Sequence, residues 1–513
     1  MLLLAMLTAA LPAEASNVDD RISIAIQSTK TLMIRPLEPN ERDILSVYQL
    51  IYEPLIRIND NYLPESCLCE TWEPTGNGKT WTFHLRSGIT FSDGTPLTAK
   101  DVVATAQYIL DRARDEATVQ KGFYQNLRYF VKSISAKDEL TVQVKADRSY
   151  YGILYAMTFP ILPADRINQD NPPGTGPYMI TSFEPGNHIY LDYNPLWWKN
   201  APQVKHVNFF CYPTPQKAME KYEYANVDAV FTRSVAAAQY KNGTSSVSLD
   251  YRTSQLEVLI LNESYAKLKS VNVRKAIRAA VNPDKIASSV YLGMVTRTDF
   301  PTIPGTWMYP DSFSSVFVTN AAEARRLMEE DGWGDSNEDG IWDKLTEDGT
   351  ELLEMNLNLY VYEEPDNDVR IEAANLIKDQ LDAVGFNVTV IVDTYTGMQD
   401  RLTHSSGNCH LVLCSFSMDV CPDPGFLLTR GNTGNYGRYK SAQMDDLVKE
   451  LRTCATKDAY QSKLMQIWAL FVQDCPLICL YYRGGTVLSR LMYTTVRDIR
   501  EYELMRGIEE FKP

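Results

Sequence analysis

Short strand-like segments alternate with amphipathic helices in the second half of the chain. From the apolar periodicity we predict strands at residues 255–261, 353–362, 388–393, 409–416 and 476–482. The same reasoning predicts helices at residues 271–280, 321–331, 369–384, 445–453 and 459–473. Alternation of this kind favours an α/β lobe with a largely parallel sheet.

The first half of the chain shows a different pattern, with strands, turns and one strong helix start. Alternating apolar residues predict strands at 22–27 and 179–183, and helical spacing predicts a helix at 43–55. Residues 72–85 read as a hairpin that turns at Asn77-Gly78. Thr98 is a helix N-cap residue type, and Asp101 three residues later strengthens a helix start there.

The size of the chain requires more than one hydrophobic core. Single cores stop growing near about 250–300 residues, whereas this chain has 513 residues, 44% of them hydrophobic. We find no internal repeat and no low-complexity linker, so the chain must interweave its lobes. The net charge of −15 argues against nucleic acid or an anionic membrane as partner, because both require clustered positive charge.

The N-terminal segment has the features of a secretory signal. Residues 2–11 are apolar and uncharged, and they are too few to span a bilayer. Ala13-Glu14-Ala15 supplies the small residues that a signal peptidase accepts, so we predict a signal peptide at 1–15 and an exported protein, periplasmic or on the cell surface. The alternative is a buried N-terminal helix. No cysteine follows the apolar run to serve as a lipid anchor of the usual kind.

Cysteine, histidine and acidic motifs do not assemble into a metal site in the sequence. Nine cysteines cannot all pair within one chain, and Cys67-Leu68-Cys69 lacks the second pair that structural zinc needs. The histidines also lack metal-ligand spacing, so we expect no metal and no cofactor. Residues 335–346 resemble a calcium loop, but Thr346 replaces its final glutamate. An acidic turn and a calcium site both remain open there.

Motifs for catalysis and nucleotide binding are incomplete. Gly78-Lys79-Thr80 ends like a phosphate-binding loop, but Glu73 stands where that motif needs its first glycine. The glycines of 174–176 complete no dinucleotide fingerprint. No G-x-S-x-G elbow and no H-E-x-x-H helix occurs. We therefore expect a protein that is not an enzyme, with an exported hydrolase as the alternative class.

Several motifs together resemble the family 5 extracytoplasmic solute-binding proteins, the oligopeptide, dipeptide and nickel receptors of ABC importers. The most specific match is WTFHLRSGITFSDGTPLTAKDV at residues 81–102. Further matches, in the order of the family, are YEPL at 52–55, GTGPY at 174–178, YNPLWW at 193–198, VRKAI at 273–277, VNPDKI at 281–286 and PLICLYY at 476–482. The resemblance covers nearly all of the chain that follows the predicted signal.

The resemblance implies an α/β clamshell of two lobes, of the large type II class of periplasmic binding proteins with an extra inserted subdomain. Lobe I would comprise residues 16–46, 174–261 and 480–513, the inserted subdomain residues 47–173, and lobe III residues 262–479. A monomer of this kind captures its solute by hinge closure and delivers it to the permease subunits of an ABC transporter.

The site implied by the resemblance lies near the end of lobe III. A peptide receptor needs a carboxylate for the ligand's ammonium group and main-chain groups for its backbone. In similar receptors the residue at Asp419 supplies the carboxylate, and Ser415, Phe416, Ser417 and Met418 before it pair with the ligand. The plain alternative is that Asp419 caps a turn.

Other parts of the ligand site are less determined by the sequence. Thr31, Leu32 and Met33 occupy the loop that lines the cleft from lobe I in similar proteins, although an ordinary surface loop is equally compatible. The partner of a ligand carboxylate cannot be carried over, and Arg401 and Arg430 are only candidates for it. A receptor for a sugar, or for a nickel or haem chelate, is the alternative within the same class.

Overall fold

The computed structural model describes residues 20–29, 33–38, 41–75, 78–115, 124, 126–240, 246–346, 349–364, 368–404, 409–418, 423–490 and 498–511, apart from the side chains of residues 314–316 and 404. The predicted signal peptide lies outside these ranges. No helix in the described ranges is both long and apolar enough to cross a membrane.

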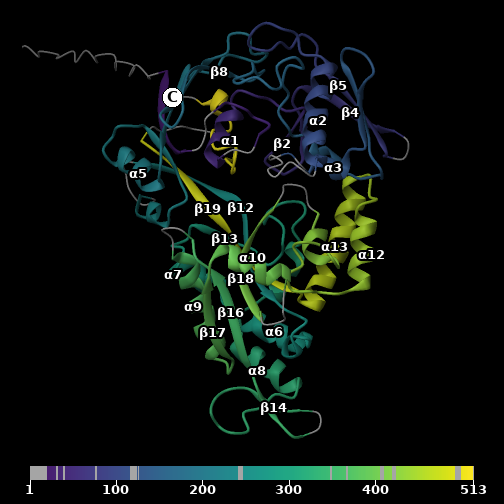
Figure 1. Ribbon diagram of the computed structural model, residues 1–513, viewed down its shortest axis with the longest axis vertical. Coiled ribbons are helices and arrows are strands. Elements are labelled where there is room, and N and C mark those ends of the chain that lie inside the picture. Colours follow the sequence, from purple (N-terminus) through teal and green to yellow (C-terminus); the bar gives the residue numbers. More distant parts are fainter. Residues whose placement is uncertain are drawn as a thin grey trace, which may run out of the picture.

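Two lobes lie one above the other, joined by long strands (Figure 1). In lobe I, strand β1 (Arg21–Gln27) lies between β10 (His206–Tyr212) and β11 (Ala229–Thr232) and runs parallel to both. Strands β9 (His188–Tyr193) and β8 (Tyr178–Glu184) extend the sheet antiparallel at its edge. The predicted strands at 22–27 and 179–183 are therefore present.

The lobes are connected by β12 (Val247–Leu261) and β19 (Leu477–Ser489), which pair antiparallel along most of their length. The C-terminal half of β19 pairs with β11 of lobe I, and the C-terminal half of β12 pairs with β18 (Leu411–Ser417) of lobe III. One eleven-stranded sheet thus runs through both lobes. The ladder between β12 and β19 is irregular between Arg252 and Leu256, where the chain passes from one lobe to the other.

Lobe III has a mixed sheet, so the prediction of a largely parallel sheet was wrong. Strand β16 (Asn356–Tyr362) runs parallel to β17 (Asn387–Asp393) and β18, but β18, β12, β19 and β13 (Val295–Arg297) are antiparallel neighbours. The reason is topological: the chain enters the lobe along β12 and returns along β19, so these strands run in opposite directions.

Helices cover both faces of the lobe III sheet. One face packs against α6 (Val271–Ala280), α8 (Ala321–Glu330) and α9 (Val369–Asp382), and the other against α12 (Ala442–Leu451) and α13 (Lys457–Asp474). All five match the predicted helices. The strand predicted at 353–362 is instead divided into β15 (Leu352–Glu354), which pairs with β14 (Asp343–Leu345), and β16.

The inserted subdomain contains a four-stranded antiparallel sheet, in the order β4 (Cys69–Thr75), β5 (Thr80–Leu85), β7 (Thr141–Lys145) and β6 (Ser133–Ala136). Helix α2 (Ala99–Arg114) packs against it. The main-chain N–H of the N-cap residue Thr98 donates to the Asp101 carboxylate at 2.8 Å, as the sequence predicted. A small hairpin of β2 (Ile56–Ile58) and β3 (Pro64–Ser66) leads into this sheet.

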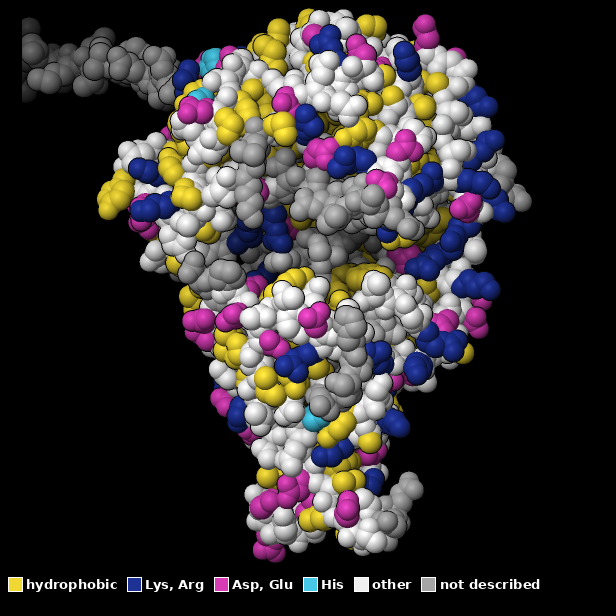
Figure 2. Space-filling view, in the orientation of Figure 1, with side chains coloured by type: hydrophobic (Ala, Val, Ile, Leu, Met, Phe, Trp, Pro, Cys, Tyr) yellow, Lys and Arg dark blue, Asp and Glu magenta, His cyan; other side chains and the backbone are white. Residues whose placement is uncertain are grey.

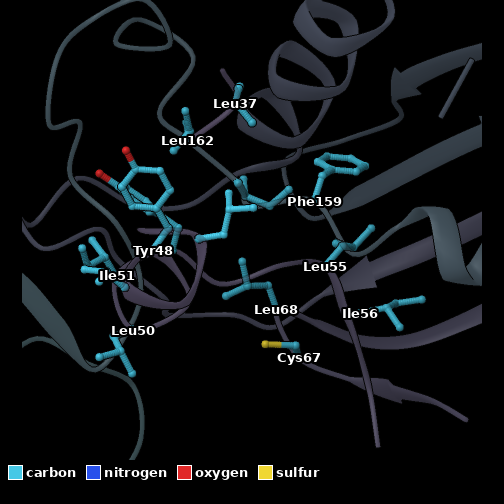
Figure 3. Packing of buried hydrophobic residues seen from close by; sticks show 14 of the residues in the cluster. Leu37, Tyr48, Leu50, Ile51, Leu55, Ile56, Cys67, Leu68, Phe159 and Leu162 are labelled. Atoms are coloured by element: carbon cyan, nitrogen blue, oxygen red, sulfur yellow. The ribbon is translucent and has the colours of Figure 1, made fainter. Parts of the chain in front are cut away.

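Lobe I and the inserted subdomain share a hydrophobic core. The cluster joins Ile22 and Ile24 of lobe I to Leu55 and Phe159 of the inserted subdomain. Figure 3 shows the part of it around Tyr48, Leu55 and Phe159. Helix α1 (Arg42–Tyr48) ends earlier than predicted, because the following residues pack against the GTGPY motif instead of continuing the helix. A Cβ atom at Gly174 would lie 2.0 Å from the Ile51 carbonyl oxygen, which explains why this motif begins with glycine.

The remaining elements are short. The helices are α3 (Leu127–Phe130), α4 (Ile153–Ala156), α5 (Pro215–Glu223), α7 (Pro283–Ser289), α10 (Tyr395–His404) and α11 (Gly425–Leu428). The 3-10 helices are η1 (Val235–Tyr240), η2 (Ala266–Leu268), η3 (Asp311–Val316) and η4 (Ile508–Glu510).

Cysteines and the acidic loop have structural roles in the described chain. All eight described cysteines are free thiols and seven are buried. Burial raises the pKa of the Cys67 and Cys69 thiols to about 12, so both remain protonated. In the acidic loop, the Asp335 carboxylate accepts hydrogen bonds from the main-chain N–H groups of Asp339 and Gly340, at 3.0 Å each. This carboxylate stabilises the turn of its own loop.

Acidification should destabilise lobe III through His410. Its Nδ1 accepts a hydrogen bond from the Asn358 main-chain N–H at 2.9 Å, and burial lowers its pKa from 6.5 to about 4. The neutral ring therefore stabilises the fold above pH 6.5, and this contribution is lost as the pH falls towards 4. The substitution His410→Asn retains a hydrogen-bond acceptor but cannot be protonated in this pH range. Between pH 7 and 4 we expect the free energy of unfolding of this variant to fall by about 1–2 kcal/mol less than that of wild type, after allowing for solvent screening.

Urea unfolding of wild type and His410→Asn at pH 7 and pH 4 measures this difference. The matched control is His206→Asn, since the His206 ring contacts Asp192 on lobe I and not lobe III. Equal pH dependence in His410→Asn and wild type would contradict the prediction.

Candidate functional site

The space between the lobes is bordered by the carboxyl ends of β16, β17 and β18. In Figure 2 the surface is hollowed between the two halves, and Lys and Arg side chains are visible in the hollow. Ligands of open α/β sheets bind outside the carboxyl ends of the strands. The predicted segment 415–418 lies at the end of β18, which places it at this border.

Side chains alternate at the end of β18. The Ser415 hydroxyl lies 3.2 Å from Arg370 Nη2 and 3.2 Å from the Tyr362 hydroxyl. Phe416 points to the opposite face, where it stacks on Tyr436 in the core of lobe III. The Phe416 side chain is therefore part of the core, whereas the Ser415 side chain orients charged groups.

The last residues of β18 pair with a strand on one side only. Ser415, Phe416 and Ser417 pair with β12, whereas the described pairing with β16 ends at Leu413. Met418 continues along β12, since its N–H donates to the Ser254 carbonyl oxygen at 2.8 Å. The other edge of residues 415–417 faces no strand in the described part of the chain. Such an edge can accept the extended main chain of a peptide.

Four charged side chains form a closed ring beneath this edge. Glu257 is fully buried and contacts Arg370 Nη2 at 2.7 Å and Arg483 Nε at 2.7 Å. Glu364 contacts the same two arginines, Arg370 Nη1 at 2.7 Å and Arg483 Nη1 at 2.9 Å. The Arg370 Nη1 and Arg483 Nε contacts are ion pairs that lack hydrogen-bond alignment. The ring is neutral in total charge.

The ring holds Glu257 in its charged form. Burial alone would raise the pKa of this carboxyl group, but the charges of Arg370 and Arg483 outweigh that desolvation and lower the pKa below its ordinary value. The same carboxylate fixes both arginines at the crossing of the lobes. Removing one member of a buried ion network leaves the others uncompensated, which costs about 3–5 kcal/mol.

Lobe I contributes a second charged group next to the hinge. Arg42 pairs with Glu501 at 3.0 Å, and Glu501 also accepts a hydrogen bond from the Ser254 N–H at 2.6 Å. The Ser254 carbonyl oxygen also accepts the hydrogen bond from the Met418 N–H. Ser254 therefore connects the end of β18 to Glu501 of lobe I. Met33, from the loop predicted to line the cleft, is exposed.

The other predicted residues fall outside the site or outside the described chain. Asp419, Thr31 and Leu32 are not among the described residues. Arg401 and Arg430 are both exposed, and their side chains pair with Asp393 and Asp445. These two pairings leave both arginines engaged on the surface of lobe III.

Sequence reasoning missed the charged ring. One signal was present: Glu257 is the single acid within a strand of apolar residues, 256–261, that is buried on both faces. A buried acid needs a cationic partner. Nothing in the sequence indicates which of the many arginines supplies it, because Arg370 and Arg483 are far from Glu257 along the chain.

The inserted subdomain touches lobe III through aromatic side chains. Trp307 Nε1 of lobe III donates to the Tyr62 carbonyl oxygen at 3.0 Å, and the Tyr151 N–H donates to the Cys454 carbonyl oxygen at 2.7 Å. The Tyr151 ring meets Trp307 edge-on, with centroids 6.0 Å apart, and is tilted against Tyr460 at 6.2 Å. We call these contacts the aromatic interface. Opening of the lobes would have to break them.

A cavity of about 330 Å³ lies at the hinge between the three parts of the chain. Its lining comes from the crossing strands, from the loop before β13, from the C-terminal segment and from Tyr62 of the inserted subdomain. The lining residues are Tyr62, Asp250, Tyr251, Arg252, Gly293, Met294, Val295, Thr296, Gly484, Gly485, Asp498, Ile499 and Arg500.

Comparison with known proteins identifies relatives among solute receptors. Residues 64–438 match the family model of bacterial extracellular solute-binding proteins, family 5 middle. The oligopeptide-binding protein AppA of Bacillus subtilis is 24% identical over 484 residues, which cover 89% of this chain and 86% of AppA. The nickel-binding periplasmic protein of Escherichia coli is 25% identical over 321 residues, 58% of this chain and 59% of that protein.

Solved structures agree with the expected clamshell. The structure of Bacillus subtilis AppA in complex with a nonapeptide has a TM-score of 0.69 at 21% identity and covers 96% of this chain and 99% of that chain. Likeness at this level of identity shows the fold. The predicted two-lobed α/β clamshell is thereby confirmed.

Replacing Glu257 by glutamine should destabilise lobe III. The substitution removes the negative charge that compensates two buried arginines, so we expect the free energy of unfolding to fall by about 3–5 kcal/mol. Chemical denaturation measures it, with Glu372→Gln on the exposed face of α9 as the matched control. A loss as small as that of the control would show that the ring contributes little.

Replacing Trp307 by alanine should shift the lobes towards an open arrangement. The change removes one interlobe hydrogen bond and one aromatic contact, which together contribute about 1–3 kcal/mol. Small-angle scattering should show a larger radius of gyration than wild type. Trp342→Ala is the control, since the Trp342 ring donates to Val384 within lobe III. An equal radius of gyration in Trp307→Ala and Trp342→Ala would exclude a role for the aromatic interface in closure.

Proposed function

Because this chain belongs to family 5 of the bacterial extracellular solute-binding proteins, we propose that it captures short peptides and delivers them to the permease subunits of an ABC importer. The observation that carries the proposal is the unpaired edge of β18 at residues 415–417, next to the crossing of the lobes. A peptide main chain can pair with such an edge whatever its side chains are.

Capture follows from the architecture in three steps. The lobes turn about the irregular part of the β12 and β19 ladder, a peptide main chain pairs with β18, and the lobes close over it. The Asp419 carboxylate neutralises the ligand's ammonium group, which requires full hydrogen bonding to be favourable in a buried site. Thr31, Leu32 and Met33 contact the ligand from lobe I. No bond in the ligand is broken, so the protein acts as a receptor and not as an enzyme.

A peptide fits this border better than a sugar or a metal chelate does. The edge of β18 offers main-chain donors and acceptors at the spacing of an extended strand, which a compact chelate cannot match along its length. Similarity to the nickel-binding protein of Escherichia coli makes a nickel chelate the second candidate. Incubation with peptides and, separately, with nickel and histidine distinguishes the two.

The remaining parts of the proposal concern processing and organisation. Signal cleavage after Ala15 would release the exported protein outside the cytoplasm, and the protein would act as a monomer. We propose the boundaries predicted from the sequence, 16–46, 174–261 and 480–513 for lobe I, 47–173 for the inserted subdomain and 262–479 for lobe III, with the chain crossing between the lobes inside β12 near residues 252–256. The sheet that continues from lobe I into lobe III along β12 and β19 supports this interwoven division.

Native mass spectrometry of the purified protein tests the proposed function. Incubation with a mixture of peptides of two to nine residues should give complexes with intact peptides. The same preparation incubated with nickel and histidine is the comparison. Complexes with the chelate alone would replace the peptide proposal, and peptide cleavage products would indicate a hydrolase.

Asp419→Asn should weaken the binding of peptides that have a free N-terminus. Loss of the charge pair is expected to cost about 2–5 kcal/mol of binding free energy if the pair is buried. Asp423→Asn is the matched control, because Asp423 lies in the same motif but its carboxylate pairs with Arg452 at 2.7 Å. Calorimetry with a free and an N-acetylated peptide measures the effect. Unchanged affinity in Asp419→Asn would remove this residue from the site.

A further inference from the structure

Two arginines that line the hinge cavity have no ion-pair partner among the described residues. No ion pair joins Arg252 or Arg500 to a carboxylate of the described chain, although most other arginines near the crossing of the lobes are paired. Buried cations without a counter-charge are costly, and proteins retain them mainly where a ligand or a partner supplies the charge.

Within the described chain, the hydrogen bonds of Arg500 go to main-chain oxygens. Its Nη1 donates to the Ile58 carbonyl oxygen at 3.2 Å and its Nη2 to the Asn59 carbonyl oxygen. The Nε atom is buried and has no hydrogen-bond partner. Burial, together with the nearby charge of Arg506, lowers the pKa of the Arg500 guanidinium, and the charges of Tyr62, Glu503 and Asp60 offset this only in part. This environment would be relieved by an anion.

Arg252 reaches the same cavity from the crossing strand β12. Its Nη1 donates to the Pro304 carbonyl oxygen at 2.7 Å, and its Nη2 lies 3.4 Å from the Tyr62 hydroxyl. Both guanidinium groups lie over the Tyr62 ring, at 4.0 Å from its centroid for Arg500 and 5.9 Å for Arg252. One aromatic ring thus holds two cations on the same cavity.

Tyr62 is itself held in an unusual conformation. Its φ of 59° lies in the left-handed region, which bulky residues rarely adopt. The Tyr62 carbonyl oxygen accepts hydrogen bonds from Tyr155 at 2.8 Å and from Trp307 at 3.0 Å. Contacts from the inserted subdomain and from lobe III therefore hold the main chain at Tyr62, whose ring lies against the two arginines. Strain of this kind is retained at ligand sites more often than elsewhere.

Acidic residues at the cavity do not neutralise the arginines. Asp250 and Asp498 are both exposed and therefore screened by solvent. Arg506 contacts Asp60 at 3.1 Å and does not line the cavity. Arg252 and Arg500 are half-buried, so solvent screens their charges less than it screens those of the two exposed acids.

We propose that Arg252 and Arg500 form an anion subsite of the cleft that binds the C-terminal carboxylate of the captured peptide. The inference rests on the proposed function and adds to it the group that receives the negative end of the ligand. The carboxylate would hydrogen-bond to Arg500 Nε and to Arg252, and it would supply the charge that both lack. Guanidinium groups bind carboxylates through strong, directional hydrogen bonds.

The position of the subsite suits a short ligand. Arg252 precedes Ser254 by two residues on β12, a distance of about 7 Å along a strand. Ser254 in turn binds Met418, at the end of the β18 edge. The cavity therefore lies beside the end of β18 at which a ligand would be held.

A competition experiment tests the subsite. Wild type, Arg500→Gln, Arg252→Gln and Arg506→Gln are each incubated with an equimolar mixture of peptides of two to nine residues, half with a free C-terminus and half amidated. Native mass spectrometry gives the ratio of bound acid to bound amide. We expect a ratio of about tenfold or more in wild type and a ratio near one in Arg500→Gln. Arg252→Gln should reduce the ratio in the same direction.

Arg506→Gln is the matched control. Arg506 donates to the Ile58 carbonyl oxygen as Arg500 does, but it lies outside the cavity. This variant should keep the wild-type ratio, and thermal melts establish that all variants are folded. If the acid-to-amide ratio also falls to near one in Arg506→Gln, the effect comes from the structure of the segment around Ile58, and the subsite is overturned.

The remaining outcomes are distinguishable. A wild-type ratio near one would overturn the subsite while peptide capture stands. Absence of any bound peptide would defeat the proposed function itself. A second amidated mixture, with glutamate or glutamine at the last position, identifies the source of the carboxylate. If the acid-to-amide ratio in the first mixture is near one and peptides ending in glutamate are preferred in the second, the subsite binds an acidic side chain and not the C-terminal carboxylate.

Discussion

The antiparallel pair of β12 and β19 is the constraint on which the rest of the molecule depends. The chain enters lobe III along one strand and leaves it along the other, so the lobes can turn about this pair but cannot separate. The ladder is irregular between Arg252 and Leu256, opposite Gly484 and Tyr482. An irregular ladder next to glycine bends more easily than a regular one. Hinge motion is therefore a property of a short piece of backbone.

The charges around this crossing fall into two kinds. On one face of the strands, Glu257 and Glu364 compensate Arg370 and Arg483, and the ring they form is neutral and structural. Arg252 lies opposite Gly484, on the face that Arg483 does not occupy, and no described carboxylate forms an ion pair with it. A compensated ring stabilises the fold whether or not a ligand is present. Unpaired cations at a cavity are suited to a ligand that brings the opposite charge.

Elements with strong local patterns could be predicted from the sequence. Helices such as α6 and α9 were found because their apolar residues recur at helical spacing over two turns or more. The strand at 353–362 and the helix at 43–55 were predicted too long, since tertiary packing around Met355 and around Gly174 interrupts them. The parallel sheet was predicted wrongly because strand direction depends on how the chain returns, which periodicity does not record.

The sequence by itself determined that more than one core is needed, most of the elements and the family resemblance, because each depends on length, residue type and short-range spacing. Only the tertiary structure decided which charges meet. Glu257 and Arg370 are 113 residues apart and come together because two strands and a helix pack side by side. Arg252 and Arg500 meet over Tyr62 for the same reason. Contacts between distant segments follow from packing, which local patterns cannot specify.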